Sequence, residues 1–239
     1  GVLVGKTFNF YDGVIKGQSG KGTSINGTIT ATPTGYGVRK TSSTVNSVTT
    51  ETAVLVPANY AEYNGSTIIS YYETLASATT YVTSGNTIKP LVDKTETKES
   101  TVTVSKTVTL DLNGKTITLN DTTLKNNGTL TITGSGTLTN SSTNGDFSIY
   151  NTGTVTVSSG TISSIQGAIH NNGTAIVTGG TIISTSYVGV FNRAEGVLTV
   201  GTNETTPSVS TTVPSITGKI AGVLVGKTFN FYDGVIKGQ

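Results

Sequence analysis

The stretch Thr154-Val-Thr-Val-Ser-Ser-Gly-Thr-Ile162 decides the fold, because its pattern returns elsewhere in the chain without gaps. Residues 228–236 read Thr-Phe-Asn-Phe-Tyr-Asp-Gly-Val-Ile, and residues 174–182 read Thr-Ala-Ile-Val-Thr-Gly-Gly-Thr-Ile. Each burst alternates apolar and polar residues, reaches a glycine and resumes with a second short apolar run. Alternation with a period of two predicts strands, and the glycine predicts a corner between them.

These bursts recur at the spacing of coils in a solenoid. One equivalent inward position is assigned to Leu112, Ile132, Val157, Val177, Val200 and Phe231, which gives coils of 20, 25, 20, 23 and 31 residues. A single burst cannot bury its apolar side, but bursts stacked about 4.8 Å apart form parallel sheets around a continuous core. The sequence therefore predicts an all-β chain folded as a parallel β-helix, right-handed because parallel crossovers generally have that hand.

Glycine and asparagine occupy the predicted corners. The corner glycines, expected to adopt positive φ, are Gly114, Gly136, Gly160, Gly180 and Gly234. The asparagines before the next burst, which can turn the backbone or stack as ladders of side-chain amides, are Asn127, Asn151, Asn171, Asn172 and Asn192. The threonines between inward positions are expected to face outward.

Residues 71–83 are the one segment with a helical pattern. Tyr71, Leu75, Ala78 and Val82 fall on one face of a helix, and Ser84-Gly85 follows. Such a short helix is unstable alone, so we expect it to cap one end of the stack. The coils are predicted to begin at about residue 88.

The segment Gly1–Gln18, GVLVGKTFNFYDGVIKGQ, returns letter for letter as Gly222–Gln239. The offset of 221 residues (222 minus 1) predicts a tandem array with a 221-residue unit. Residues 1–40 are then the C-terminal coils of a preceding unit, residues 41–57 the inter-unit seam, and residues 58–239 the next unit, truncated in mid-stack. Both copies are expected in equivalent coil environments. Two readings stay open: a window of one long polypeptide, or a self-assembling unit.

Composition excludes several classes of function. Charged residues make up only 12% of the 239 residues, the net charge is +2, and no block of like charge occurs. Nucleic-acid binding, which needs clustered lysine and arginine, is therefore not expected. Cysteine is absent, which excludes disulfides and thiolate metal sites, and no apolar stretch is long enough for a membrane span.

Several motifs resemble one known group of proteins. They are Tyr72-Glu-Thr-Leu75, Ser84-Gly-Asn-Thr-Ile88, Val108-Thr-Leu-Asp-Leu-Asn-Gly-Lys115 and the Asn-Phe-Tyr-Asp-Gly of residues 9–13 and 230–234. Together they resemble β-helix repeat modules of large secreted or cell-surface, adhesin-like proteins of anaerobic Gram-positive bacteria. The resemblance implies a helix that caps the first coil, an extracellular or cell-surface location, and a structural role in a stalk or fibre. It implies no catalytic residues.

Exposed aromatic residues are the best candidates for ligand contact. Tyr11, its copy Tyr232, and Tyr36 could stack on sugar rings, although tyrosines at strand ends also serve packing alone. Glycans are thus a candidate partner, beside neighbouring copies of the same repeat within the chain or end to end. We assign no catalytic, cofactor-binding or metal-binding residue.

An enzyme remains the alternative, as a polysaccharide lyase or glycosidase, which would need clustered carboxylates. The acids of the stack are spread thinly: Asp93, Asp111, Asp121, Asp146, Glu195, Glu204 and Asp233. Arg193 is expected to pair with Glu195, and the single histidine, His170, to point outward into solvent. A flat ice-binding array of threonines is a further alternative, which unequal coil lengths should disrupt. The sequence thus favours a structural β-solenoid module over a catalyst.

Overall fold

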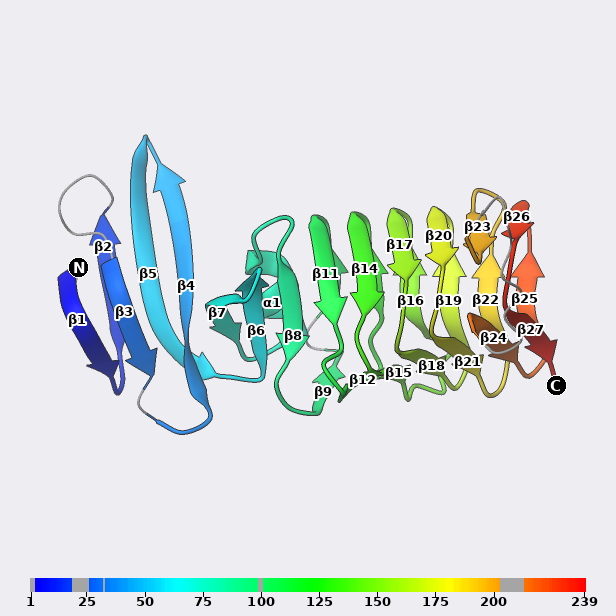
Figure 1. Cartoon of the computed structure of the whole chain (residues 1–239), viewed down its shortest axis with the longest axis horizontal. Helices are drawn as coiled ribbons and strands as arrows, with labels where there is room; N and C mark the ends of the chain where they lie inside the picture. The colour runs from blue at the N-terminus through cyan, green and yellow to red at the C-terminus, as the bar shows by residue number, and fades with distance from the viewer. Residues whose placement is uncertain (1–2, 19–25, 32, 99–100, 203–212) are drawn as a thin grey trace.

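The chain is elongated, with the N-terminal strands at one end and the last coil at the other (Figure 1). The computed structural model describes residues 3–18, 26–31, 33–98, 101–202 and 213–239. Most of this length is a β-solenoid with one short helix, as predicted. Glu204 lies outside the described residues.

Three sheets, parallel from coil to coil, form the solenoid. The first sheet contains β10 (Val102–Val104), β13 (Leu124–Asn126), β16 (Phe147–Asn151), β19 (Gly167–Asn171), β22 (Val188–Asn192) and β25 (Ala221–Val225). The second contains β8 (Thr87–Pro90), β11 (Thr107–Asp111), β14 (Thr129–Thr133), β17 (Thr154–Val157), β20 (Thr174–Val177), β23 (Val197–Val200) and β26 (Thr228–Phe231). The third contains β9 (Lys94–Thr97), β12 (Lys115–Asn120), β15 (Gly136–Asn140), β18 (Thr161–Ser164), β21 (Thr181–Ser184), β24 (Ser215–Gly218) and β27 (Val235–Gly238).

The second sheet confirms that the predicted positions are equivalent in all coils but one, although Phe231, in the last coil, is 51% exposed rather than buried. Its register aligns Ile132, Val157, Val177, Val200 and Phe231. The first member is wrong, because Leu110 rather than Leu112 pairs with Ile132. Leu112 is also buried, but it lies in the corner after β11, where Asn113 has a positive φ of 52°. The inward position of this coil is therefore Leu110, two residues before the one that the coil spacing predicted.

A ladder of buried asparagine amides runs along the first sheet. Nδ2 of Asn126 donates to Oδ1 of Asn151 (2.6 Å), Nδ2 of Asn151 to Asn171 (2.7 Å), and Nδ2 of Asn171 to Asn192 (2.7 Å). The predicted ladder is confirmed, except that its first member is Asn126 and not Asn127. Asn172 lies outside the ladder and donates to the Tyr150 hydroxyl at the surface. The amides hold each coil in register with the next.

The predicted corner glycines all have positive φ, for example 80° at Gly160 and 75° at Gly180. The expectation that unequal coils break the threonine rows is wrong, because the extra residues lie in loops between the strands. Thr107, Thr129, Thr154 and Thr174 stay in register. The neighbouring row, Thr109, Thr131 and Thr156, is interrupted by Ile176.

The N-terminal strands are arranged differently from the coils. β1 (Leu3–Phe10) pairs in parallel with β3 (Asn26–Ala31), while β2 (Val14–Gln18), β5 (Val48–Pro57) and β4 (Tyr36–Val45) form an antiparallel sheet. β6 (Tyr60–Asn64) and β7 (Thr67–Tyr72) then form an antiparallel hairpin that joins the second sheet through β8. The polar residues 41–57 therefore lie in the β4–β5 hairpin, and the position of an inter-unit seam stays a prediction.

The two copies of the eighteen-residue segment do not lie in equivalent coil environments, contrary to expectation. The second copy follows the coils, with β26 parallel to β23 and β27 parallel to β24. In the first copy β2 pairs antiparallel with β5 instead. Strand partners outside the segment cause the difference.

The capping helix is shorter than predicted. α1 spans Leu75–Tyr81, whereas Tyr71 lies in β7, because pairing with β6 holds residues 67–72 extended. Thr74 is the N-cap, and its hydroxyl accepts from the amide of Ser77 (3.1 Å). Leu75 and Ala78 are buried in the core at the N-terminal end of the coils. The helix covers the open apolar end of the stack, as a cap should.

Candidate functional site

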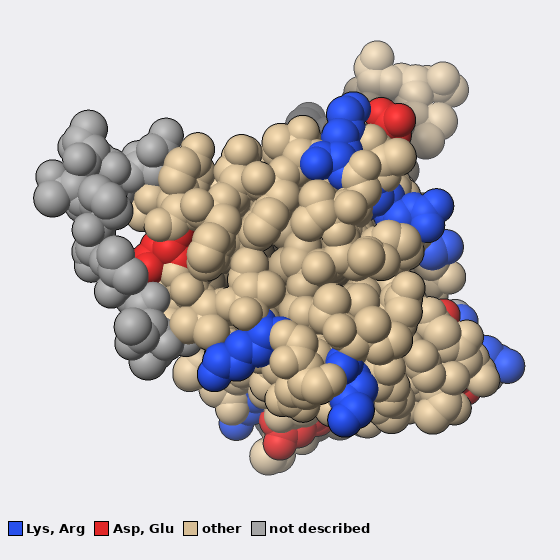
Figure 2. Space-filling view, turned by 90° about the vertical axis from the view of Figure 1, so that its right-hand side faces the viewer, with Lys and Arg blue, Asp and Glu red and all other residues tan. Residues whose placement is uncertain are grey.

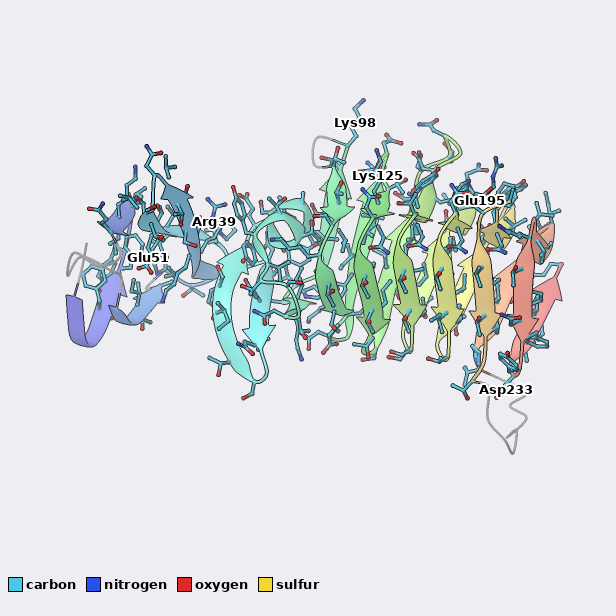
Figure 3. All side chains as sticks on the ribbon, turned by 90° about the horizontal axis from the view of Figure 1, so that it is seen from above. Arg39, Glu51, Lys98, Lys125, Glu195 and Asp233 are labelled. Carbon is cyan, nitrogen blue, oxygen red and sulfur yellow. The ribbon has the colours of Figure 1, made fainter. Side chains whose placement is uncertain are left out.

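A groove of about 410 Å³ lies between the β4–β5 hairpin and the capping helix. It is lined by Lys40, Thr41, Ser42, Glu51, Thr52, Glu62, Ile69, Thr80, Tyr81, Thr83 and Lys106. The hairpin brings Arg39 and Glu51 to the same end of the molecule (Figure 3). This groove combines both signs of charge with an aromatic ring, so its value as a ligand site depends on which of its polar groups already have partners within the protein.

The carboxylate of Glu62 is occupied by hydrogen bonds to residues around the capping helix. Its side chain is buried, and its Oε1 accepts from the amide of Thr83 (2.9 Å) and from Nδ2 of Asn86 (2.7 Å). Its Oε2 accepts from the hydroxyl of Tyr72 (2.6 Å). Burial, above all, and this hydrogen bond raise the pKa of the Tyr72 hydroxyl. A carboxylate with three donors stabilises the strand–helix junction and has little capacity left for chemistry.

Glu96 holds the other side of the cap. Its Oε1 accepts from the hydroxyl of Tyr60 (2.8 Å) and from the amide of Leu75 (3.0 Å), the first residue of α1. Burial raises the pKa of the Glu96 carboxyl, although both hydrogen bonds act in the opposite direction. Burial also raises the pKa of Tyr60. Glu96 therefore ties the start of the helix to the third sheet.

Lys106 binds the opposite end of the helix. Its Nζ donates to the carbonyls of Thr80 (2.8 Å) and Val82 (2.7 Å), which lie at the C-terminal end of α1. A cation there is favoured by the helix dipole. The guanidinium of Arg39 lies over the ring of Tyr81, 5.4 Å from its centroid. The charged groups with these contacts hold the cap and the hairpin in place.

A row of aromatic rings lies on the outer face of the first sheet. Tyr150, His170 and Phe191 occupy register-matched positions on β16, β19 and β22. The ring of His170 stacks on Tyr150 (4.5 Å between centroids, 12° between planes) and meets Phe191 edge-on (5.5 Å). Each ring directly precedes a ladder asparagine, and this sequence signal could have revealed the row.

His170 is packed rather than solvated. It points outward as expected, but Phe147 also contacts its ring at 5.2 Å, and its Nδ1 is buried without a hydrogen-bond partner among the described residues. Burial lowers the pKa of His170, and the positive charge of Arg193 lowers it further. The imidazole is therefore neutral at physiological pH and serves as a packing group.

The three candidate tyrosines do not form one site. Tyr11 follows β1 and Tyr36 begins β4, whereas Tyr232 follows β26 at the opposite end of the molecule. All three are exposed, at 67%, 48% and 40% respectively. Each is open to solvent on its own, so their role in sugar stacking stays a prediction.

The carboxylates of the stack serve turns and neighbouring strands. Asp93 accepts from the amide of Thr116 (2.7 Å), and Asp111 accepts from the amide of Asn113 (3.0 Å) and pairs with Lys89 (2.8 Å). Glu195 and Asp233 project from opposite long sides of the stack (Figure 3).

The expected pair between Arg193 and Glu195 is wrong. The guanidinium of Arg193 lies over Phe191, 4.9 Å from its centroid, while Glu195 pairs with Lys227 (3.6 Å). Across the described residues, no group of three or more His, Asp or Glu is placed to hold a metal. No helix in the described part is long and apolar enough to cross a membrane. Comparisons with protein-family models, curated proteins and solved structures gave no match, so no family is identified.

Proposed function

We propose that this chain is a structural tandem-repeat module of an extracellular or cell-surface fibre or stalk, with an adhesin-like setting. The proposal is carried by one combination: an uninterrupted core and amide ladder along the stack, in a chain that repeats eighteen residues at an offset of 221. The groups best placed for chemistry, Glu62, Glu96 and Lys106, are bound to the cap. Length, stiffness and display are what such a stack supplies.

The location part of this proposal rests on the resemblance of the capping and LDLNGK motifs to surface repeat modules. It is tested with an antibody raised against the folded chain and applied to intact cells of the source. We expect surface labelling that mild protease treatment of intact cells removes. Labelling that appears only after the cells are permeabilised would contradict an extracellular role.

Carbohydrate binding is the second candidate, and exposed Tyr11, Tyr36 and Tyr232 support it. A glycan array probed with the wild-type chain and with Tyr11→Ala/Tyr36→Ala/Tyr232→Ala would decide. Glycan binding that the triple variant loses would favour a ligand-binding module. Tyr63→Ala is a matched control, because Tyr63 is a partly exposed tyrosine on β6 outside this set.

A further inference from the structure

The groove between the β4–β5 hairpin and the capping helix is built by residues 40–106, well inside the chain. Its two walls are joined beside β7, where the amide of Lys40 donates to the hydroxyl of Ser70 (3.0 Å). Its volume of about 410 Å³ lies within the range of about 300–1,000 Å³ that is usual for small-molecule sites. The groove is therefore large enough for a small ligand.

Several hydroxyl groups of the lining are not used by the protein. The lining residues whose hydroxyls have no hydrogen-bond partner among the described residues are Thr41, Ser42, Thr52 and Thr83. Each hydroxyl can donate one hydrogen bond and accept others. A ligand that itself carries many hydroxyls matches such groups, and this is the chemistry of a saccharide.

The backbone of β4 adds further polar groups, because β4 is the outer strand of its three-stranded sheet. The amide of Lys40 points away from β5 and toward Ser70. Backbone groups of every second residue on an antiparallel strand point to the same side, so the N–H and C=O of Ser42 also point away from β5. No described strand pairs with β4 on that side. The edge therefore offers a ligand both a donor and an acceptor.

Positive charge outweighs negative charge around the groove. Its cations are Arg39, Lys40 and Lys106, and its carboxylates are Glu51 and Glu62. The ammonium of Lys40 is exposed and has no partner among the described residues, whereas both carboxylates already interact with other parts of the protein. On the end of the molecule that carries the last coil, charged side chains are few and scattered (Figure 2). The groove thus favours an anion with a single negative charge.

Tyr81 gives this polar lining an aromatic surface. Its side chain is 50% exposed, and the guanidinium of Arg39 lies 5.4 Å from the centroid of its ring. Nε of Arg39 is buried and has no hydrogen-bond partner among the described residues. A tyrosine ring combines apolar contact area with a polar hydroxyl, which suits the C–H groups and hydroxyls of a sugar.

We propose that this groove binds a hexuronate, a sugar unit that carries one carboxylate. Lys40 pairs with the carboxylate, and the free hydroxyls and the edge of β4 bind the hydroxyls of the sugar. A sugar phosphate is disfavoured, because its second negative charge would face the two carboxylates of the lining. A site in this groove goes beyond the structural role proposed above and is separate from the exposed tyrosines, since none of Tyr11, Tyr36 and Tyr232 lines it.

The first experiment is titration calorimetry of the whole chain with short oligosaccharides of galacturonate, glucuronate and mannuronate. The matched control for each is its carboxyl-reduced form, which keeps the ring and its hydroxyls but has no charge. We expect at least one acid to bind, and its reduced form to bind about tenfold more weakly or worse, because a hydrogen bond between charged groups is lost. No binding of any acid, equal binding of the reduced form, or tighter binding of glucose 6-phosphate would overturn the proposal.

The second experiment compares two lysine variants of equal net charge. Lys40→Met removes the proposed partner of the carboxylate and should weaken binding about tenfold or more. Lys125→Met is the matched control, because Lys125 is also an exposed lysine but lies on β13 among the coils, away from the hairpin (Figure 3). Its affinity should equal that of the wild-type chain. Equal losses in the two variants would show an effect of net charge alone and would contradict a site at Lys40.

The third experiment locates the ligand by protection of a single thiol. The chain has no cysteine, so Ser42→Cys places one thiol in the groove, and Ser43→Cys places one on the next residue of β4, which does not line it. The bound hexuronate should slow the reaction of the first thiol with a disulfide reagent and leave the second unchanged. Equal protection of both would place the sugar outside the groove. Failure of this site would leave the fibre role standing, since surface labelling of intact cells tests that role separately.

Discussion

The first eighteen residues pair with different strands from the last eighteen, although the two segments are identical letter for letter. Their central turn is the same in both. Oδ1 of Asp12 accepts from the amide of Gly13 (2.6 Å), where φ is 99°, and Oδ1 of Asp233 accepts from Gly234 (2.7 Å), where φ is 105°. An aspartate side chain that binds the next residues, with glycine at positive φ, needs no distant partner. Turn geometry therefore comes from the local sequence.

The strands around that turn differ because their partners differ. β1 runs from Leu3 to Phe10, whereas the same residues in the second copy form β25 and β26 with a break between them. At the break the amide of Gly226 donates to the carbonyl of Asn192 (2.6 Å), and Nδ2 of Asn192 donates to the carbonyl of Thr228 (2.9 Å). The last asparagine of the ladder thus imposes a corner that the first copy lacks. Strand boundaries follow from tertiary contacts, as is common for β-structure.

The largest effect is expected from Val157→Asp. Val157 is fully buried, so the substitution places an unpaired charge among the core ladders and should cost about 4 kcal/mol or more of unfolding free energy. Urea unfolding followed by circular dichroism measures that loss. The neighbouring Thr156→Asp, on the outer face, should change stability by about 0.5 kcal/mol or less. Equal losses in the two variants would contradict the assigned inward face.

Val157→Asp should also affect the two copies of the eighteen-residue segment differently. The second copy rests on β23 and the stack below it, while the first copy rests on β3 and β5. Amide exchange measured by NMR should therefore rise in β26 of Val157→Asp and stay unchanged in β1. Increased exchange in both copies would show that they unfold as one unit.

A smaller loss is expected from Asn171→Ala. Asn171 accepts from Nδ2 of Asn151 and donates to Oδ1 of Asn192, so its removal takes one hydrogen-bond partner from each of these buried amides, although both still donate to backbone carbonyls. The expected cost is about 2 kcal/mol, since each unsatisfied buried group costs on the order of 1–3 kcal/mol. Thermal melts compare it with Asn172→Ala, whose surface hydrogen bond should be worth well under half as much. A neutral Asn171→Ala would show that the ladder does not stabilise the corners of the second copy.

The smallest effect is a dependence of stability on pH through His170. Its pKa is lowered in the folded chain, so the unfolded chain binds more protons below the ordinary histidine pKa of about 6.5. Stability is therefore full above that value and falls as the pH is lowered through it. Because His170 is the only histidine, His170→Gln should remove the difference between melts at about pH 7.5 and about pH 6. If His170→Gln shows the same difference between the two melts as the wild-type chain, the pH dependence of stability would come from carboxylates instead. In the first sheet, His170 pairs with Phe191, and Phe191 pairs with Leu224 of the second copy. Protonation of His170 should therefore destabilise the second copy and leave the first copy unchanged.

Sequence patterns predicted the solenoid well because every coil needs the same residue types at the same places. Alternating residues, a corner glycine and a following asparagine carry the fold in each coil, and Gly160 and Asn171 illustrate both corners. Leu112 was misplaced because two leucines, Leu110 and Leu112, both have the alternation of an inward residue. Which of them enters the ladder depends on the turn that Asn113 begins.

The region near the cap was less predictable. Tyr71 fits a helical face as well as a strand, and only its pairing with Ala61 on β6 decides between them. Glu62 and Glu96 drew no attention in the sequence because isolated acids give no periodic signal, and their partners lie 10 to 36 residues away. The surroundings of Gly1–Gln18 could not be predicted at all, since they come from strands outside that segment.

The reactivity of single thiols at the two equivalent phenylalanines is the most direct test of these two environments. The chain contains no cysteine, so Phe10→Cys and Phe231→Cys each carry one thiol within the same local sequence. At low protein concentration in native buffer, we expect the thiol of Phe231→Cys to react with a disulfide reagent at close to the rate of an unfolded control. The thiol of Phe10→Cys should react many times more slowly, since β3 and its neighbours cover it. Equal native rates would contradict the conclusion that one sequence occupies two different environments in this molecule.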